Sequence, residues 1–236
     1  MNILLTGASR GIGAAALALL MSAGHKVAGH STRGGDGLIG ADLSHPDSPR
    51  RLWDEAAAKL GGIDVLINNA GIYEDVADDA PDAEWHAAWA RTLTINLQAA
   101  ADLSRLAIAH FRTRGDGPRG GRIVNVASRA AFRGDSPAHW HYAASKAAMI
   151  GMTRTIARGY AAENILAFAV APGFTVTEMT EEYLSSRGGE KILADIPLGR
   201  VSTAGEVAET IRWLATDAPA AATGSIIDVN GASFVR

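Results

Sequence analysis

The chain has 236 residues, of which 47% are apolar and 20% are charged, a composition typical of one compact globular domain with a substantial core. Its formal net charge of -3 gives no electrostatic reason to expect nucleic acid or an anionic membrane surface as a partner. The absence of cysteine excludes disulfides, thiol nucleophiles and cysteine-ligated metals.

Short apolar runs alternate along the chain with longer segments of helical period. The predicted order is strand 2–6, helix 12–23, strand 26–30, strand 38–41, helix 49–60, strand 65–68, helix 83–112, strand 122–127, helix 142–160, strand 165–171, helix 204–215 and strand 225–229. This alternation predicts an α/β fold, a doubly wound seven-stranded parallel sheet with helices on both faces. The whole chain, 1–236, is predicted to form a single domain.

Two connections are unusual. The segment "STRGGDG" at 31–37 is too short for the dozen or more residues of a parallel crossover, so a glycine-rich loop is expected to replace a helix there. The segment 177–199 has polar helix formers interrupted by Gly188 and Gly189, and it is predicted to form a mobile substrate lid.

No stretch approaches the roughly 18 to 20 apolar residues of a membrane span. The start "MNILLTGASRG" lacks the basic beginning and long apolar region of a signal peptide. We therefore expect a soluble, cytoplasmic protein, and the lack of cysteine is compatible with a reducing cytosol.

The first predicted strand leads into "TGASRGIG" at 6–13 and then into a helix. Gly7 is suited to the tight strand-to-helix turn, Gly11 to close approach of the backbone to a pyrophosphate, and Gly13 to close packing of the helix on the sheet. Free N–H groups and the helix dipole would then face an anion. This turn predicts a dinucleotide site, although its glycine spacing departs from the usual fingerprint.

Several motifs occur in one order along the chain. They are "TGASRGIG", "NNAG" at 68–71, Asn96 in "TINLQ", Ser128 in "VNVAS", Tyr142 and Lys146 in "YAASK", and "PG" at 172–173. Over essentially its whole length the chain thus resembles the short-chain dehydrogenase/reductase family. The resemblance implies a single-domain Rossmann fold, a nicotinamide cofactor, and hydride transfer between that cofactor and a ketone or secondary alcohol.

The resemblance also implies where the cofactor is bound. The pyrophosphate and adenosine ribose are expected near Thr6 and the turn, Asp42 and Leu43 are expected beside the adenine, and the residues after the fourth strand border the cofactor. The full set of expected cofactor-binding residues is Gly7, Ser9, Arg10, Gly11, Ile12, Gly13, Ser31, Thr32, Arg33, Asp42, Leu43, Asn69, Ala70, Gly71, Tyr142, Lys146, Pro172, Gly173, Thr175 and Thr177.

Tyr142 and Lys146 lie four residues apart, so on a helix they share one face. An adjacent ammonium stabilises a phenolate, so Lys146 is expected to lower the pKa of Tyr142 and make it an acid for a carbonyl oxygen. Ser128, at a predicted strand end, is expected to hydrogen-bond the same oxygen. The resemblance adds that Lys146 binds the nicotinamide ribose and that Asn96 holds a water in a proton relay.

NAD-preferring enzymes usually carry an acidic residue at the end of the second strand. Here "VAGHSTR" has none, and His30, Ser31, Thr32 and Arg33 are candidate ligands of a 2′-phosphate, with Arg10 as a second cation. NADP is therefore predicted in preference to NAD.

The substrate is less constrained. The C-terminal stretch beginning "IPLGR" most resembles 3-oxoacyl-acyl-carrier-protein reductases, with Arg33, Arg129 and Arg133 as candidate contacts for an acidic carrier. A sugar, a steroid and a small cyclic ketone are the alternative substrates. His139 and His141 have no evident acidic or cysteine partner, so they are assigned to a pocket wall or subunit contact, and no metal is predicted.

Two other functions compete with that of a reductase. A non-catalytic NAD(P)-binding regulatory protein would normally have lost Tyr142 or Lys146, and both are present. An epimerase or dehydratase would need a longer C-terminal substrate region. The family resemblance also implies a homotetramer, although "NGAS" near the C-terminus replaces the more usual "DGG".

Overall fold

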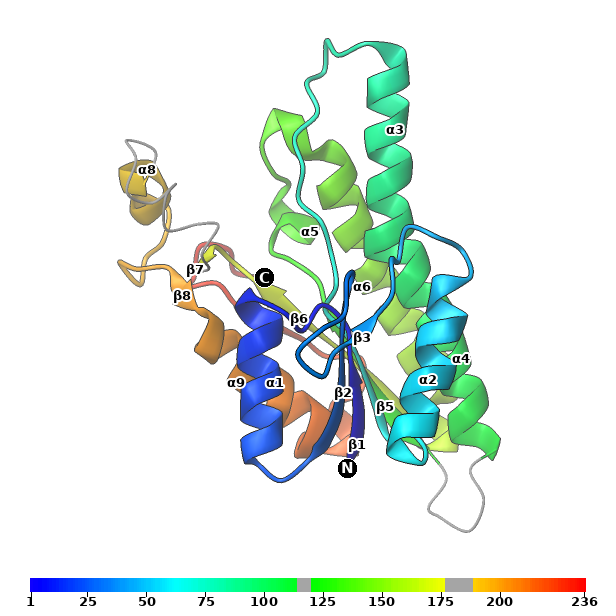
Figure 1. The fold of residues 1–236 in the computed structure, drawn as a ribbon. Helices are drawn as coiled ribbons and strands as arrows, with labels where there is room; N and C mark the ends of the chain where they lie inside the picture. The colour runs from blue at the N-terminus through cyan, green and yellow to red at the C-terminus, as the bar shows by residue number, and fades with distance from the viewer. Residues whose placement is uncertain (114–119, 177–188) are drawn as a thin grey trace.

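The computed structural model describes residues 1–113, 120–176 and 189–236 (Figure 1). Within these residues seven strands form one sheet in the order β3-β2-β1-β4-β5-β6-β9, and every neighbouring pair is parallel. The strands are β1 (Asn2–Leu5), β2 (Lys26–Ser31), β3 (Ile39–Gly40), β4 (Val65–Asn68), β5 (Gly121–Val126), β6 (Ile165–Pro172) and β9 (Ile226–Val229). The predicted sheet is confirmed. Its strand order reverses between β1 and β4, which places a ligand crevice at the carboxyl ends of these strands.

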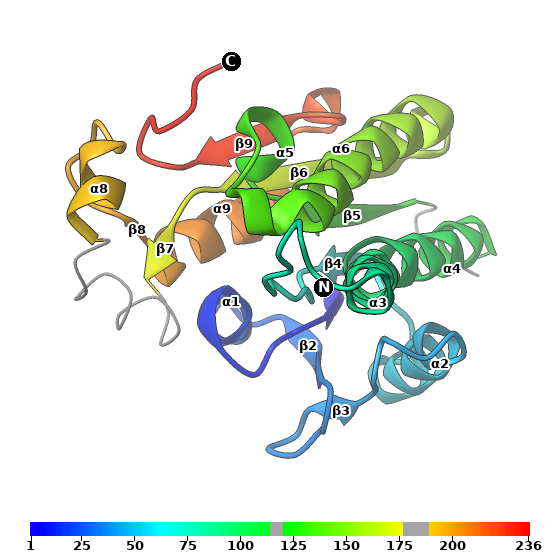
Figure 2. The ribbon, with the colours of Figure 1, turned by 90° about the horizontal axis from the view of Figure 1, so that it is seen from above.

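Helices cover both faces of the sheet (Figures 1 and 2). Two helices, α1 (Gly11–Ser22) and α9 (Ala204–Thr216), pack on one face. Three others, α2 (Ser48–Leu60), α4 (Ala99–Thr113) and α6 (Trp140–Tyr160), pack on the opposite face.

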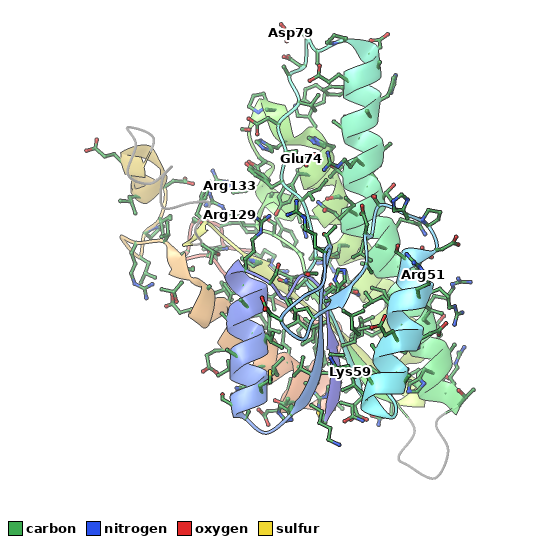
Figure 3. All side chains as sticks on the ribbon, in the orientation of Figure 1. Arg51, Lys59, Glu74, Asp79, Arg129 and Arg133 are labelled. Atoms are coloured by element: carbon green, nitrogen blue, oxygen red, sulfur yellow. The ribbon has the colours of Figure 1, made fainter. Side chains whose placement is uncertain are left out.

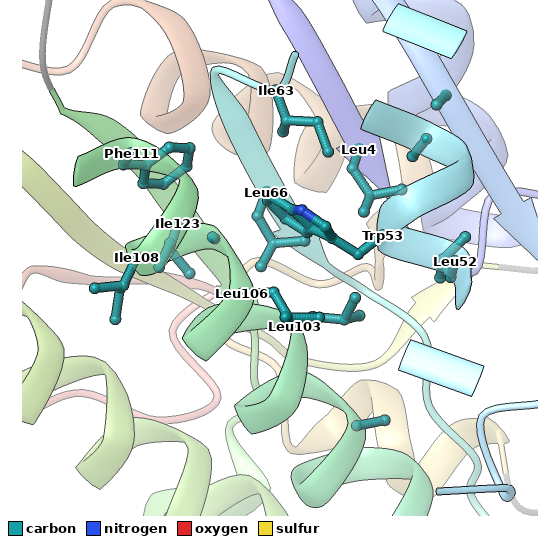
Figure 4. Close-up of a cluster of buried hydrophobic side chains, with 14 of the residues drawn as sticks. Leu4, Leu52, Trp53, Ile63, Leu66, Leu103, Leu106, Ile108, Phe111 and Ile123 are labelled. Atoms are coloured by element: carbon teal, nitrogen blue, oxygen red, sulfur yellow. The ribbon is translucent and has the colours of Figure 1, made fainter. Parts of the chain in front are cut away.

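Alternation along the strands supplies both cores, because successive strand side chains point to opposite faces. Leu4 of β1 joins Trp53 and Phe111 in the cluster under α2 and α4 (Figure 4). Its neighbours Ile3 and Leu5 join the cluster under α1 and α9. All eight residues of β6 are buried, as expected of a strand covered on both faces.

The predicted single helix over 83–112 is wrong in one respect. The structure has α3 (Asp82–Leu93), then a π-helical turn, η1 (Thr94–Gln98), and then α4. A π-turn widens the backbone locally, and its cause here is visible in Asn96, whose side chain is bonded to the backbone of Ile72. Such turns are frequent at functional sites.

The predicted loop between β2 and β3 is confirmed. Four consecutive residues, 34–37, have positive φ, and three of them are glycines, which adopt this backbone without a side-chain clash. The Gly34 N–H donates to Ser31 Oγ at 3.0 Å and closes the turn.

Short elements outside the prediction surround the carboxyl edge of the sheet. They are α5 (Ala130–Arg133), η2 (Pro137–His139), η3 (Ala161–Glu163), α8 (Gly189–Ala194), η4 (Ala220–Ala222), and β7 (Thr175–Val176) paired with β8 (Ser202–Thr203). The predicted lid lies outside the described residues over 177–188, and its remainder contains α8. Among the residues described, no helix is long and apolar enough to cross a membrane.

Candidate active site

The turn between β1 and α1 has a backbone conformation and close contacts that favour glycine. Gly7 and Gly11 have φ of +66° and +54°, which side-chain-bearing residues rarely adopt. A Cβ placed on Gly13 would lie 1.9 Å from the Gly7 carbonyl oxygen, so the first turn of α1 rests directly on the strand-end backbone. The close packing of the turn against α1 and the loop after β4 therefore requires glycine at positions 7 and 13.

His30 fixes the turn from the neighbouring strand. Its Nδ1 accepts a hydrogen bond from the Gly7 N–H at 3.2 Å, and its Nε2–H donates to the Ala41 carbonyl at 2.8 Å. The ring is only 2% exposed, and burial lowers its pKa below the ordinary value of 6.5. The expectation that His30 binds a 2′-phosphate is therefore wrong, because both ring nitrogens are committed to the backbone in the neutral form.

Thr6 and Asn69 join the turn to the loop after β4. Thr6 Oγ1 accepts from the Asn69 and Ala70 N–H groups, both at 3.0 Å, while the Asn69 amide donates to the Gly7 carbonyl at 2.9 Å. The two loops that begin at the strand-order reversal are thus held as one unit. This explains why an asparagine-rich motif accompanies the glycine turn.

A cleft of two adjoining hollows follows the carboxyl edge of the sheet. The outer hollow, of about 470 Å³, lies over the glycine turn, and the inner one, of about 420 Å³, lies over the ends of β5 and β6. They share six lining residues, Arg10, Ile12, Asn69, Gly71, Ile72 and Tyr142, and so form one continuous cleft. A cleft made of two connected hollows suits an extended ligand with two bulky parts.

Most of the predicted cofactor residues line this cleft. The outer hollow contains Gly7, Ser9, Arg10, Gly11, Ile12, Gly13, Ser31, Thr32, Asp42, Leu43, Asn69, Ala70, Gly71 and Tyr142. The inner hollow contains Ser128, Tyr142, Lys146, Pro172, Gly173 and Thr175. Arg33 is an exception, since it lines neither hollow, and Thr177 lies outside the described residues.

Sequence reasoning missed other lining residues. Ile95 and Arg91 line the outer hollow, and they lie one helical turn apart ahead of Asn96. Tyr73 and Glu74 line the inner hollow just after "NNAG", and Glu74 forms an ion pair of 3.1 Å with Arg91. Both pairs of residues lie next to a motif identified in the sequence, and that proximity was the available indication that they line the cleft.

Ser128, Tyr142 and Lys146 meet in the inner hollow. Ser128 follows β5, whereas Tyr142 and Lys146 stand one turn apart at the start of α6. Ser128 is near enough to the Tyr142 hydroxyl to act as a hydrogen-bonding neighbour that lowers its pKa. The Lys146 Nζ donates to the Val126 carbonyl at 2.9 Å and lies 5.8 Å from the centroid of the Tyr142 ring.

The expected lowering of the Tyr142 pKa by Lys146 is not found. Burial raises the pKa of Tyr142 to about 12, and the Ser128 hydrogen bond offsets this only partly. Burial also lowers the pKa of Lys146 to about 8, because its ammonium has one carbonyl acceptor in place of water. Desolvation is the largest cause for both groups, and at neutral pH Tyr142 is a phenol beside a largely protonated Lys146.

Asn96 lies behind the cleft and does not line it. Its Oδ1 accepts from the Ile72 N–H at 2.8 Å, and its Nδ2 donates to the Ile72 carbonyl at 2.9 Å. The same amide lies 3.3 Å from Ser145 Oγ on α6. Asn96 therefore ties the loop after β4 to the helix that carries Tyr142.

Two arginines beside the inner hollow have a protein partner. Arg129 and Arg133, which lie close together in Figure 3, both pair with Asp195. Arg129 also lies 4.9 Å from the ring of Phe174. Their predicted availability to an acidic carrier is therefore reduced by an internal carboxylate.

The view that His139 lacks an acidic partner is also wrong. Its Nε2 lies 2.8 Å from Asp75 Oδ1, a residue 64 positions earlier in the chain. In the part of the chain that is described, no three histidine or acidic side chains gather as a metal site would require.

Comparison with known proteins extends over the same residues. A family model described as enoyl-(acyl carrier protein) reductase matches residues 7–232. Nodulation protein G of Rhizobium sp. (strain N33) is 39% identical, covering 97% of this chain and 94% of that protein. The 3-oxoacyl-(acyl-carrier-protein) reductase FabG of Thermotoga maritima is 35% identical, covering 97% and 95%.

Solved structures give the same result. The TT0495 protein from Thermus thermophilus superposes with a TM-score of 0.87 at 30% identity, over 98% of this chain and 97% of that one. The aldohexose dehydrogenase of Thermoplasma acidophilum superposes with a TM-score of 0.85 at 28% identity, over 99% and 94%. With its Rossmann-type sheet and this cleft, the chain belongs to the short-chain dehydrogenase/reductase family and is an oxidoreductase that acts on CH–OH groups with a nicotinamide cofactor.

Proposed function

We propose that this chain is an NADPH-dependent ketone reductase, with a 3-oxoacyl thioester as its first-choice substrate. One observation carries the proposal: Ser128, Tyr142 and Lys146 together line the inner hollow of the cleft that begins at the glycine turn. A carbonyl oxygen placed between the Ser128 and Tyr142 hydroxyls would receive two hydrogen bonds while its carbon faces the adjoining hollow.

The residues of the cleft fit a dinucleotide. The turn that borders the outer hollow has no room for a methyl group at Gly7 or Gly13, and a Cβ on Gly71 would lie 3.4 Å from Lys146 Nζ. We expect the glycine turn to hold the pyrophosphate, Asp42 and Leu43 to border the adenine, and Pro172, Gly173 and Thr175 to border the nicotinamide. The nicotinamide supplies the hydride when the cofactor is bound.

In reduction, Tyr142 gives its phenolic proton to the carbonyl oxygen. The phenol carries its proton at neutral pH, as this direction requires, but a pKa of about 12 makes it a weaker acid than a free tyrosine, so the transfer depends on the neighbouring groups. Ser128 donates to the same oxygen and stabilises its developing charge. The ammonium of Lys146 stabilises the phenolate that forms, and we propose that Lys146 and Asn96 return the proton through a water.

Replacement of Tyr142 by phenylalanine tests the mechanism against the alternative of a non-catalytic binding protein. Loss of one general acid is expected to lower kcat by about 100- to 10,000-fold. NADPH affinity, measured by fluorescence titration, is expected to stay near the wild-type value because the ring is kept. Undiminished turnover in Tyr142→Phe would show that the proton comes from elsewhere.

The preference for NADPH rests on Arg10 and on the missing acid after β2. Arg10, Ser31 and Thr32 line the outer hollow where the adenosine ribose is expected. Because guanidinium presents several donors to a phosphate, Arg10→Ala should raise the KM for NADPH and leave that for NADH nearly unchanged. A wild-type enzyme that clearly preferred NADH would contradict this assignment.

The thioester proposal draws on the similarity to the 3-oxoacyl-(acyl-carrier-protein) reductase of Thermotoga maritima and on the "IPLGR" segment. The structural similarity to an aldohexose dehydrogenase makes a sugar the second candidate substrate. NADPH oxidation should therefore be compared for an acetoacetyl thioester, aldoses, steroids and small cyclic ketones. No turnover of any thioester would remove the first choice and leave ketone reduction intact.

We also propose that the chain is a cytoplasmic homotetramer and that 1–236 is a single domain whose lid spans 177–199. The family commonly assembles through the helices that here start near Ala83 and Tyr142, and through the C-terminal strand. Light scattering that found a monomer at micromolar concentration would contradict the tetramer. Limited proteolysis is expected to cut the lid first, with slower cutting when NADPH is bound.

A further inference from the structure

Tyr73 stands at the mouth of the inner hollow, directly beside Tyr142. The two ring centroids are 4.8 Å apart, and the rings are nearly perpendicular at 86°. Tyr73 lines the inner hollow and is 46% exposed, so one face of its ring looks into open space. A carbonyl compound bound beside Tyr142 would occupy the same hollow that this ring lines.

The opposite face of the Tyr73 ring is covered by His139. The two rings are stacked, with centroids 3.8 Å apart and planes 6° from parallel. His139 is itself buried; its Nδ1 is hydrogen-bonded with Ser136 Oγ at 2.6 Å, and its Nε2 lies 2.8 Å from Asp75 Oδ1. Burial and the Ser136 bond therefore restrict movement of the ring behind Tyr73.

The phenol end of Tyr73 is tethered as well. Its hydroxyl donates to Asp135 Oδ1 at 3.2 Å, and the same carboxylate oxygen accepts from the Ser136 N–H at 2.8 Å. Tyr73 follows β4, whereas Asp135 follows α5, so the side chain bridges the two segments that flank Tyr142. Swinging the ring outward would break both the stack and this hydrogen bond.

We propose that Tyr73 is the residue that sets substrate size in this pocket and that His139 is its positioning residue. The clamped ring admits ketones whose carbon beside the carbonyl is unbranched, such as a 3-oxoacyl chain. It excludes ketones that are substituted or cyclic at that carbon, because their extra atoms would overlap the ring. The inference rests on the proposed ketone reduction and adds the class of ketone to it.

The test measures kcat/KM for an unbranched 3-oxo ester and for its 2,2-dimethyl and cyclic counterparts, with NADPH as cofactor. Tyr73→Ala is expected to raise the branched-to-unbranched ratio by at least about 10-fold, the discrimination typical of one methylene in a close-fitting pocket. Tyr73→Phe keeps the ring and should keep the ratio.

His139 variants separate positioning from general damage to the fold. His139→Ala removes the ring that stacks on Tyr73 and should raise the branched-to-unbranched ratio by a smaller factor than Tyr73→Ala does. His139→Phe keeps a stacked ring and should keep the ratio near the wild-type value. Tyr160→Ala is the matched control, because that tyrosine lies at the far end of α6. It should leave the ratio unchanged.

The outcomes are distinguishable. An unchanged ratio in a Tyr73→Ala enzyme that binds NADPH normally would overturn the inference and leave ketone reduction standing. A wild-type enzyme that binds NADPH but reduces none of the ketones would overturn the proposed function and, with it, this inference. If Tyr73→Ala does not fold, Tyr73→Leu provides the same comparison with less loss of packing.

Discussion

Replacement of His30 tests how the phosphate-binding turn is held. His30→Ala removes the hydrogen bonds to the Gly7 N–H and the Ala41 carbonyl. A bond is worth about 1 kcal/mol net, whereas a buried backbone group that is left unpaired costs about 1 to 3 kcal/mol. We expect the free energy of unfolding to fall by about 3 kcal/mol. The five tryptophans allow this to be measured by fluorescence in urea.

The pH dependence gives the sharper measurement. Because burial lowers the pKa of His30 below 6.5, the unfolded chain binds the extra proton more readily than the folded one. The stabilisation is therefore complete above pH 6.5 and is lost as the pH falls toward the folded-state pKa. Uptake of one such proton changes the free energy of unfolding by at most about 1.4 kcal/mol per pH unit.

His30→Gln is the matched variant, since its amide keeps one acceptor and one donor but does not titrate in this range. Subtracting its unfolding free energy from that of the wild type, at each pH from about 5.5 to 7.5, removes the contribution of the other histidines. The difference should shrink as the pH decreases below 6.5. A difference that stays constant over this range would refute the assigned hydrogen bonds. The affinity for NADPH should likewise decrease as the pH decreases below 6.5.

Three further outcomes are expected. Gly13→Ala should abolish NADPH binding and lower stability by about 1 to 3 kcal/mol, because its Cβ would overlap the Gly7 carbonyl; titration and urea unfolding measure this, and normal binding would contradict it. The kcat/KM for reduction should decline above pH about 8 as Lys146 loses its proton, and a flat profile to pH about 9 would exclude that role. Thr203→Ala should cost about 1 kcal/mol in urea, since Thr203 and Glu206 form a capping box on α9, whereas Thr203→Ser should not.

Much of this architecture follows from sequence pattern. The apolar runs give all seven strands in nearly their observed positions, since a parallel sheet buried on both faces requires continuous apolar segments. The segment 31–37 predicts a loop in place of a helix because it is simply too short. The position of Tyr142 and Lys146 on one helix face follows from their spacing of four, and the structure places both in the cleft.

Other features depend on contacts that sequence does not display. The π-turn at 94–98 exists because Asn96 bonds the backbone of Ile72, a partner 24 residues away. His30 looks like a free phosphate ligand until the fold brings Gly7 and Ala41 to its two nitrogens. The prediction for the pKa of Tyr142 is wrong for the same reason, since spacing reveals a neighbouring charge but not the burial that opposes it.

The helix-free link between β2 and β3 has a consequence for engineering. Ser31 and Thr32 border the expected adenosine ribose, yet the link that follows them contains four residues of positive φ and no helix. Lys59 of α2 donates to the Gly37 carbonyl of this link at 2.9 Å, so an exchange of the link for that of a relative should retain a carbonyl there. The proposed preference for NADPH over NADH would then be open to transplantation as one short segment, without redesign of the interior.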